Sequence, residues 1–170
     1  RFKLDVYLIN MANAHQRLAA MTSRLSAVGL EAERFEAVDG SKIDFPIPEF
    51  SPLAYAILHG RRTCPAEVGC YLSHVECARK LLAGDADAAL ILEDDVMFDP
   101  DFVEAIDAAA THSDSWDILR LTTVNAGRKF AFRQITPKRK LAISLTREKG
   151  AGAYVINRRA AEWILTDLIT

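Results

Sequence analysis

Three consecutive acidic residues, Glu93, Asp94 and Asp95, directly follow a continuous apolar run over residues 88–92. In α/β sheets, ligands bind beyond the carboxyl ends of the strands, so this is where a site is expected. Adjacent carboxylates repel one another and raise each other's pKa unless a cation compensates. In an extended chain alternate residues face the same way, which predicts Glu93 and Asp95 on one side and Asp94 on the other.

Two carboxylates on one side suit a hard divalent ion such as Mn²⁺ or Mg²⁺, which completes its shell with phosphate oxygens and water. The alternative is that these acids cap the next helix or lie in solvent. Asp99 already precedes Pro100 in the order expected of a helix cap, which weakens that alternative. Spacing alone leaves both interpretations open, and Mn²⁺ (or Mg²⁺) at Glu93 and Asp95 is the prediction.

A second set of candidate ligands lies on a predicted helix over residues 65–82, where Cys70, His74 and Cys77 share one face. Zinc sites normally draw ligands from more than one element and need a fourth. Small cysteines on a packed helix more often belong to the core. Cys70 and Cys77 are therefore predicted to be packing residues.

Alternating strands and helices must position these residues. Strands are predicted at residues 6–9, 31–38, 88–92, 117–121 and 153–156, and helices at 13–28, 65–82, 99–110 and after Asn157. Residues 42–52 read as loop, and 128–147 are left unassigned. This order predicts an α/β fold with helices flanking a mostly parallel central sheet. At 170 residues the chain fits a single domain.

Charge is unevenly distributed along the chain. The net charge of −2 argues against a nucleic-acid partner, which would require a positive excess. Residues 85–117 hold 11 acidic and no basic side chains, whereas residues 128–149 hold eight basic side chains against Glu148. Such a chain can bind a cation in one place and an anion in another, or present two solvated faces. Three cysteines without framework spacing favour a reduced, cytosolic protein, and no apolar run approaches a bilayer span.

Residues 67–74, Glu-Val-Gly-Cys-Tyr-Leu-Ser-His, and residues 91–96, Ile-Leu-Glu-Asp-Asp-Val, together resemble glycosyltransferase family 25. That family includes lipooligosaccharide galactosyltransferases of bacteria and collagen galactosyltransferases of animals. Weaker elements agree in order and spacing at residues 6–10 with Arg17, 37–40 and 152–156.

The chain departs from the family pattern at two points. Ala66 stands where the family usually has Gly, and the chain ends at Thr170 before a further acidic motif of the family. We therefore expect one family 25 domain over residues 1–170 that is truncated at its carboxyl end.

The resemblance implies a GT-A-like (Rossmann-like) fold, a nucleotide-sugar donor and inversion at the anomeric carbon. It also implies that Glu93 and Asp95 stand at the D-x-D metal motif of such folds. Donor binding is expected from Asn10, Arg17, Asp39, Gly40, Ser73 and His74. Simpler roles stay open: Arg17 as a solvated helix residue, Asp39-Gly40 as an ordinary turn, and His74 as a histidine whose ring nitrogens are hydrogen-bonded where a helix packs on the sheet.

The expected activity is transfer of a hexose, with galactose preferred, from a UDP-sugar to a saccharide or lipid-linked acceptor in lipopolysaccharide or lipooligosaccharide biosynthesis. A cytoplasmic location is expected, with peripheral contact to an anionic membrane through the basic segment. Asp94 and Asp117 are the candidate general bases, and a residue beyond Thr170 is an equal alternative. The other hypotheses are an inactive relative that binds a glycan or nucleotide, and a nucleotidyltransferase.

Overall fold

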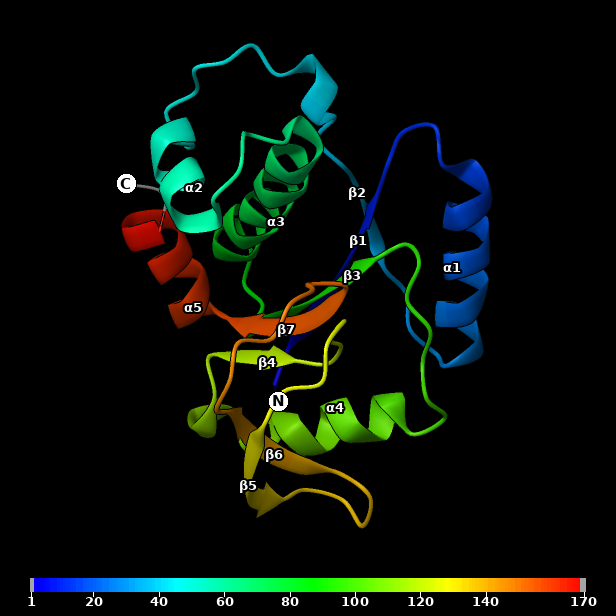
Figure 1. The fold of residues 1–170 in the computed structure, drawn as a ribbon. Helices are drawn as coiled ribbons and strands as arrows, with labels where there is room; N and C mark the ends of the chain where they lie inside the picture. Colours follow the sequence, from blue (N-terminus) through cyan, green and yellow to red (C-terminus); the bar gives the residue numbers. More distant parts are fainter. Residues whose placement is uncertain (1, 169–170) are drawn as a thin grey trace.

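The computed structural model describes residues 2–168. Five strands form one sheet in the order β2-β1-β3-β7-β4 (Figure 1). Their bounds are β1 Leu4–Asn10, β2 Glu33–Glu36, β3 Ala88–Glu93, β4 Ile118–Arg120 and β7 Ala153–Asn157. β1 runs parallel to β2 and β3, whereas β7 runs antiparallel to β3 and β4. The predicted α/β fold with a mostly parallel sheet is confirmed, with β7 as the reversed strand.

Helices cover both faces of this sheet, so the molecule has three layers (Figure 1). The helices are α1 His15–Ala27, α2 Pro52–His59, α3 Pro65–Ala83, α4 Phe102–Ala110 and α5 Arg158–Trp163, with short helical turns at Gly40–Lys42, Ser113–Ser115 and Ile164–Leu168. One core cluster contains buried residues of α1 and α4, and the other contains buried residues of α3 and α5. Among the described residues, no helix is both long and apolar enough to span a bilayer.

The central strand β3 alternates between the two cores. Leu90 and Leu92 lie in the cluster with α1 and α4, whereas Ala89 and Ile91 lie in the cluster with α3 and α5. All four are fully buried, as the apolar run predicted, and a buried Leu or Ile contributes about 2 kcal/mol of hydrophobic stabilisation. Glu93 continues the second set, and this alternation directs its side chain toward α3.

Helix starts differ in part from the predictions. Ala14 is the N-cap of α1 and makes no side-chain cap bond, so a capping box beginning at Asn13 is wrong. Asp101, not Asp99, is the N-cap residue of α4, and it makes no side-chain cap bond. The carboxylates of both aspartates instead bind the Arg139 guanidinium. The predicted cap at Asn157 is confirmed, since its side chain accepts a hydrogen bond of 2.8 Å from the amide of Ala160.

One helix and one hairpin of two strands were not predicted. Helix α2 follows the proline-rich loop and is capped by Ser51, whose hydroxyl accepts a hydrogen bond from the Ala54 amide. The unassigned basic segment forms a separate antiparallel hairpin of β5, Lys129–Gln134, and β6, Lys140–Ser144. Buried Leu141 joins the core cluster of α4 and anchors this hairpin, which otherwise exposes most of its side chains.

Candidate functional site

Two parallel strands end side by side at one edge of the sheet. In the pairing of β1 with β3, Ile9 lies opposite Glu93, so Asn10 and the acidic run meet beyond the strand ends. β3 ends at Glu93, and Asp94 and Asp95 form a turn. Carboxyl ends of parallel strands are where ligands bind in α/β folds, so the predicted location of the site is retained.

Asp94 is held in the interior by an amide and a guanidinium. Its Oδ2 accepts a hydrogen bond of 2.6 Å from Asn10 Nδ2, and its Oδ1 lies 3.3 Å from a terminal nitrogen of Arg17. Asn10 is itself buried, and its Oδ1 accepts from Nε of Arg34 at 3.1 Å. Because both Asp94 oxygens are engaged, this residue is suited to positioning Arg17, and we do not assign it as the general base.

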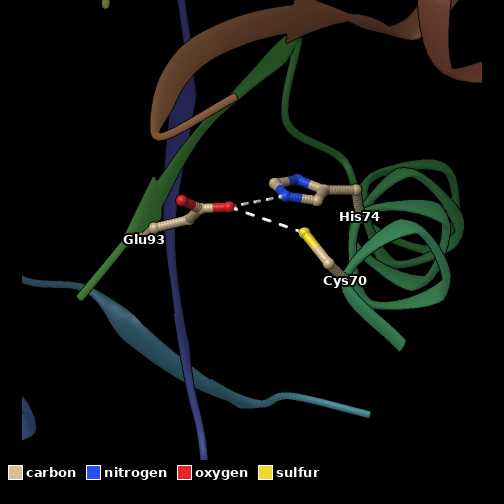
Figure 2. A group of neighbouring side chains, drawn as sticks. All are labelled: Cys70, His74 and Glu93. Carbon is tan, nitrogen blue, oxygen red and sulfur yellow. Dashed lines mark hydrogen bonds and ion pairs between the residues drawn. The ribbon is translucent and has the colours of Figure 1, made fainter. Parts of the chain in front are cut away.

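Glu93 points to the opposite side and meets α3. Its Oε1 lies 3.3 Å from His74 Nε2 and 3.6 Å from Cys70 Sγ (Figure 2). The hydrogen bond from His74 lowers the pKa of Glu93 against the opposing effect of burial, so this half-buried carboxyl group is charged at neutral pH. Nδ1 of His74 pairs with the Tyr154 hydroxyl at 2.7 Å, and the two rings pack with their centroids 5.4 Å apart.

The prediction for the cysteines is correct for Cys77 and wrong for Cys70. Cys77 is fully buried in the core cluster of α3, whereas Cys70 is exposed at the residue level and turns its thiol toward Glu93. Burial of the thiol and the adjacent carboxylate raise the pKa of Cys70 to about 11. Of the helix-face trio considered as ligands, only Cys70 and His74 come together, and Glu93 completes their group.

Asp95 does not follow the alternation of side chains along β3. The chain leaves the extended conformation after Glu93, so the position of Asp95 is set by a turn and not by the pleat of β3. Its side chain is exposed, and within residues 2–168 no ion pair engages it. Glu93 and Asp95 thus offer two carboxylates near the strand end, but only the first is held by neighbours.

Ser73 and Gly40 position the backbone beside the site. Ser73 is fully buried, and its hydroxyl accepts from the Val38 amide at 2.9 Å and donates to the Gly69 carbonyl at 2.7 Å. A Cβ on Gly40 would lie 1.7 Å from the Pro65 carbonyl oxygen, so only glycine fits there. Burial excludes Ser73 from direct contact with a donor and gives it the role of attaching residues 37–40 to α3.

Asp39 forms the predicted turn. Its Oδ1 accepts from the Ser41 amide at 3.0 Å and caps the short helix Gly40–Lys42. The Ser41 hydroxyl and amide lower the pKa of Asp39, and Lys42 lies 3.6 Å from its second oxygen. The turn is confirmed, and a ribose contact stays a prediction.

Asp117 lies at the wrong edge of the sheet to be a general base for this site. Its carboxylate accepts from Asn157 at 3.0 Å, and Asn157 is paired with Ala88 at the start of β3. The rise of a six-residue strand places that edge about 16 Å from Glu93. Arg159 also binds Asp117 and lowers its pKa. Asp117 precedes a strand that runs in the same direction as β3, which is why it ends up opposite the acidic run.

Three side chains at the site were not identified as functional from the sequence. Cys70 contacts Glu93, Tyr154 contacts His74, and Arg34 contacts Asn10. Tyr154 belongs to the family-like segment 152–156. Its contact with His74 depends on the pairing of β7 with β3, which places Tyr154 opposite Ile91 and on the face of the sheet that α3 covers. No local pattern specifies that pairing.

Comparisons with known proteins identify the family of the chain. The family model of glycosyltransferase family 25 (LPS biosynthesis protein) matches residues 3–169. A glycosyltransferase 25 family member of Anopheles gambiae is 30% identical over 67% of this chain and 21% of its own length. The probable inactive glycosyltransferase 25 family member 3 of Rattus norvegicus is 29% identical over 82% and 24%. Procollagen galactosyltransferase 2 of Homo sapiens is 27% identical over 58% and 16%.

The chain belongs to glycosyltransferase family 25. It spans about a fifth of the length of the curated relatives it matches.

Proposed function

We propose that the chain is the donor-binding part of an inverting glycosyltransferase of GT-A type that moves a hexose from a UDP-sugar to a saccharide acceptor. The observation that carries the proposal is the edge shared by β1 and β3. There, the charged carboxylate of Glu93 faces α3, the exposed side chain of Asp95 follows in the turn, and Asp94 between them binds Arg17 of α1. Carboxylates and a guanidinium at the end of one strand are the kinds of groups that bind a diphosphate bridged by a divalent cation.

Glu93 and Asp95 would hold Mn²⁺ (or Mg²⁺). Both offer oxygen donors of the kind these ions prefer, and the hydrogen bond from His74 keeps Glu93 in its charged form. When bound, such an ion supplies Lewis-acid stabilisation of the leaving nucleoside diphosphate. Arg17 has a half-exposed side chain, and its planar fork is suited to phosphate oxygens of the donor. We assign no general base within residues 2–168.

We propose galactose as the sugar and a lipopolysaccharide or lipooligosaccharide precursor as the acceptor. The name of the human relative, procollagen galactosyltransferase 2, supports the sugar, and the description of the family supports the acceptor. Contact with the anionic cytoplasmic surface of a membrane would present a lipid-linked acceptor. The hairpin of β5 and β6 suits that contact because it combines exposed Phe130 and Ile143 with Lys138 and Lys140.

Nucleotide binding tests the metal ligands. Thermal shift with UDP should show stabilisation that depends on Mn²⁺, and Glu93→Gln or Asp95→Asn should abolish it without altering the apo fold. Asp117→Asn is the matched control, because its carboxylate lies at the far edge and should not affect UDP affinity. Wild-type affinity in either of the first two variants would refute the assigned ligands.

Vesicle binding tests the membrane surface. The pair Lys138→Glu and Lys140→Glu should weaken binding to anionic vesicles by about 1 kcal/mol or more per site while leaving UDP affinity unchanged. Arg139 is left intact because it binds Asp99 and Asp101 and ties the hairpin to α4. Loss of UDP binding with vesicle binding retained would assign the hairpin to the donor site instead.

A second candidate function is binding of the nucleotide or glycan without turnover. Two observations favour it: the similarity to a rat relative named as probably inactive, and the position of Asp117 away from the acidic run. UDP release from UDP-galactose in the presence of a saccharide acceptor separates the two functions. Binding of UDP with Mn²⁺ but no UDP release would favour the inactive alternative.

A further inference from the structure

We propose that Cys70, His74 and Glu93 form a three-ligand site for a divalent transition metal of the zinc class. Cys70 and His74 lie one turn apart on α3, and Glu93 reaches the same point from the end of β3 (Figure 2). Their ligand atoms all lie within 4.8 Å of one another. The group draws on two elements of the fold, which the face of a single helix could not provide.

Two of the three separations between ligand atoms match those that a metal imposes. Zinc binds sulfur at about 2.3 Å and nitrogen or oxygen at about 2.0–2.2 Å, which in a tetrahedral shell separates ligand atoms by roughly 3.3–3.7 Å. The distance from Cys70 Sγ to Glu93 Oε1 is 3.6 Å, and that from His74 Nε2 to the same oxygen is 3.3 Å. The second distance is longer than the usual hydrogen bond of about 2.9–3.0 Å. Two edges of the tetrahedron are therefore already formed.

The chemistry of the donors selects the ion. A thiolate and an imidazole favour zinc and its later first-row neighbours, whereas Mn²⁺ and Mg²⁺ prefer carboxylate, carbonyl and water oxygens. Three protein ligands leave a fourth position for water or for an oxygen of a bound molecule. Cys70 is exposed at the level of the whole residue, although its thiol is partly buried.

Tyr154 provides the outer-shell partner that a metal-binding histidine requires. Its hydroxyl lies 2.7 Å from Nδ1 of His74, and the rings pack against each other. A ligating histidine donates its other ring N–H to an oxygen, which fixes the ring and directs the lone pair of the ligating nitrogen at the metal. The Tyr154 hydroxyl can accept that bond from Nδ1 while Nε2 faces the metal.

This site goes beyond the proposed function and shares only Glu93 with it. An ion bound by Cys70 and His74 would occupy Oε1 of Glu93, so Zn²⁺ should compete with the Mn²⁺-dependent binding of UDP. Removing the thiol separates the two, because Cys70 is not among the proposed ligands of the hard cation. Cys70→Ser should retain Mn²⁺-dependent UDP binding and lose its inhibition by Zn²⁺.

Metal titration of the reduced, purified chain tests the site directly. Co²⁺ should give thiolate-to-metal charge-transfer absorption, and calorimetry should show one Zn²⁺ per chain. Cys70→Ser should remove the absorption and weaken Zn²⁺ binding roughly 100-fold or more, and His74→Gln should weaken it similarly. Tyr154→Phe should keep the absorption and weaken Zn²⁺ binding about tenfold, as expected for an outer-shell partner.

Cys64→Ser is the matched control, since it makes the same change at the start of α3. It should leave the Co²⁺ absorption and the calorimetric Zn²⁺ binding intact. Circular dichroism of each variant verifies folding, which the exposed position of Cys70 should preserve. The proposal is overturned if Cys70→Ser binds Zn²⁺ as tightly as wild type, or if Cys64→Ser loses the absorption. Zinc binding without any UDP binding in the wild type would instead refute the proposed function alone.

Discussion

The two edges of the central sheet carry the same three residue types in different settings. At the carboxyl edge of β3, Asp94 binds Asn10 at the end of β1 and Arg17 in the following helix. At the opposite edge, Asp117 binds Asn157 at the end of β7 and Arg159 in the following helix. Both groups arise because a strand ends in asparagine and leads into a helix that carries arginine.

Burial separates the two groups. The side chain of Asp94 is 8% exposed, whereas that of Asp117 is 47% exposed. Asn10 is also buried and binds a second arginine, but Asn157 spends its Oδ1 on capping α5. A buried carboxylate depends on its partners, while a half-exposed one can exchange them for water. The same residue types therefore form a positioning group at one edge and a surface ion pair at the other.

The largest expected difference is in stability after asparagine is removed. Asn10→Ala leaves the buried Asp94 carboxylate and Arg34 without their amide partner, and should lower the free energy of unfolding by about 3 kcal/mol. Asn157→Ala removes a helix cap in a part-buried position and should cost about 1 kcal/mol. Urea denaturation of both variants measures the difference. Equal losses would mean that burial does not distinguish the two edges.

A smaller effect is expected in nucleotide affinity after arginine is removed. Arg17→Ala should weaken Mn²⁺-dependent UDP binding about tenfold, or ~1.4 kcal/mol, because the diphosphate loses its charged fork. Arg159→Ala should leave UDP affinity unchanged, since Arg159 pairs with Asp117 at the far edge. Arg17→Lys keeps the positive charge without the planar guanidinium, so its UDP affinity should lie between those of Arg17→Ala and Arg159→Ala. Calorimetric titration of UDP with Mn²⁺ checks this order, and an effect of Arg159→Ala equal to that of Arg17→Ala would contradict it.

The smallest effect concerns pH. Arg159 and Asn157 lower the pKa of Asp117 in the folded state relative to the unfolded chain. The resulting stabilisation is present above the unfolded pKa of about 3.9 and is lost as pH falls through the folded pKa. Because the group is half exposed, Asp117→Asn should cost less than about 1 kcal/mol at neutral pH. Urea curves of wild type and variant should differ at neutral pH and converge as the pH falls through the lowered pKa of Asp117; a difference that does not change with pH would contradict this role of the ionised carboxylate.

The positions of the strands and their buried character followed from local patterns. The apolar run over residues 88–92 predicted a strand covered on both faces, and all five residues are buried. The acidic triplet was correctly expected at the carboxyl end of that strand. Both the strand and the position of the acidic residues depend only on neighbouring residues in the sequence. The cap at Asn157 was predicted for the same reason, since a cap involves residues three apart.

Tertiary structure decided which side chains meet. Cys70 was predicted to be a core residue because helical periodicity does not tell which residues cover a given face of the helix. In the structure, the carboxylate of Glu93 lies against the Cys70 thiol. The turn after β3 removed Asp95 from the pleat, and the pairing of β7 with β3 brought Tyr154 to His74. The sequence alone therefore determined the α/β elements, the acidic strand end and the family resemblance, since these rest on short-range patterns. Strand order, strand direction and the partner of each polar side chain depend on packing between residues as much as 84 positions apart, and only the folded chain decided them.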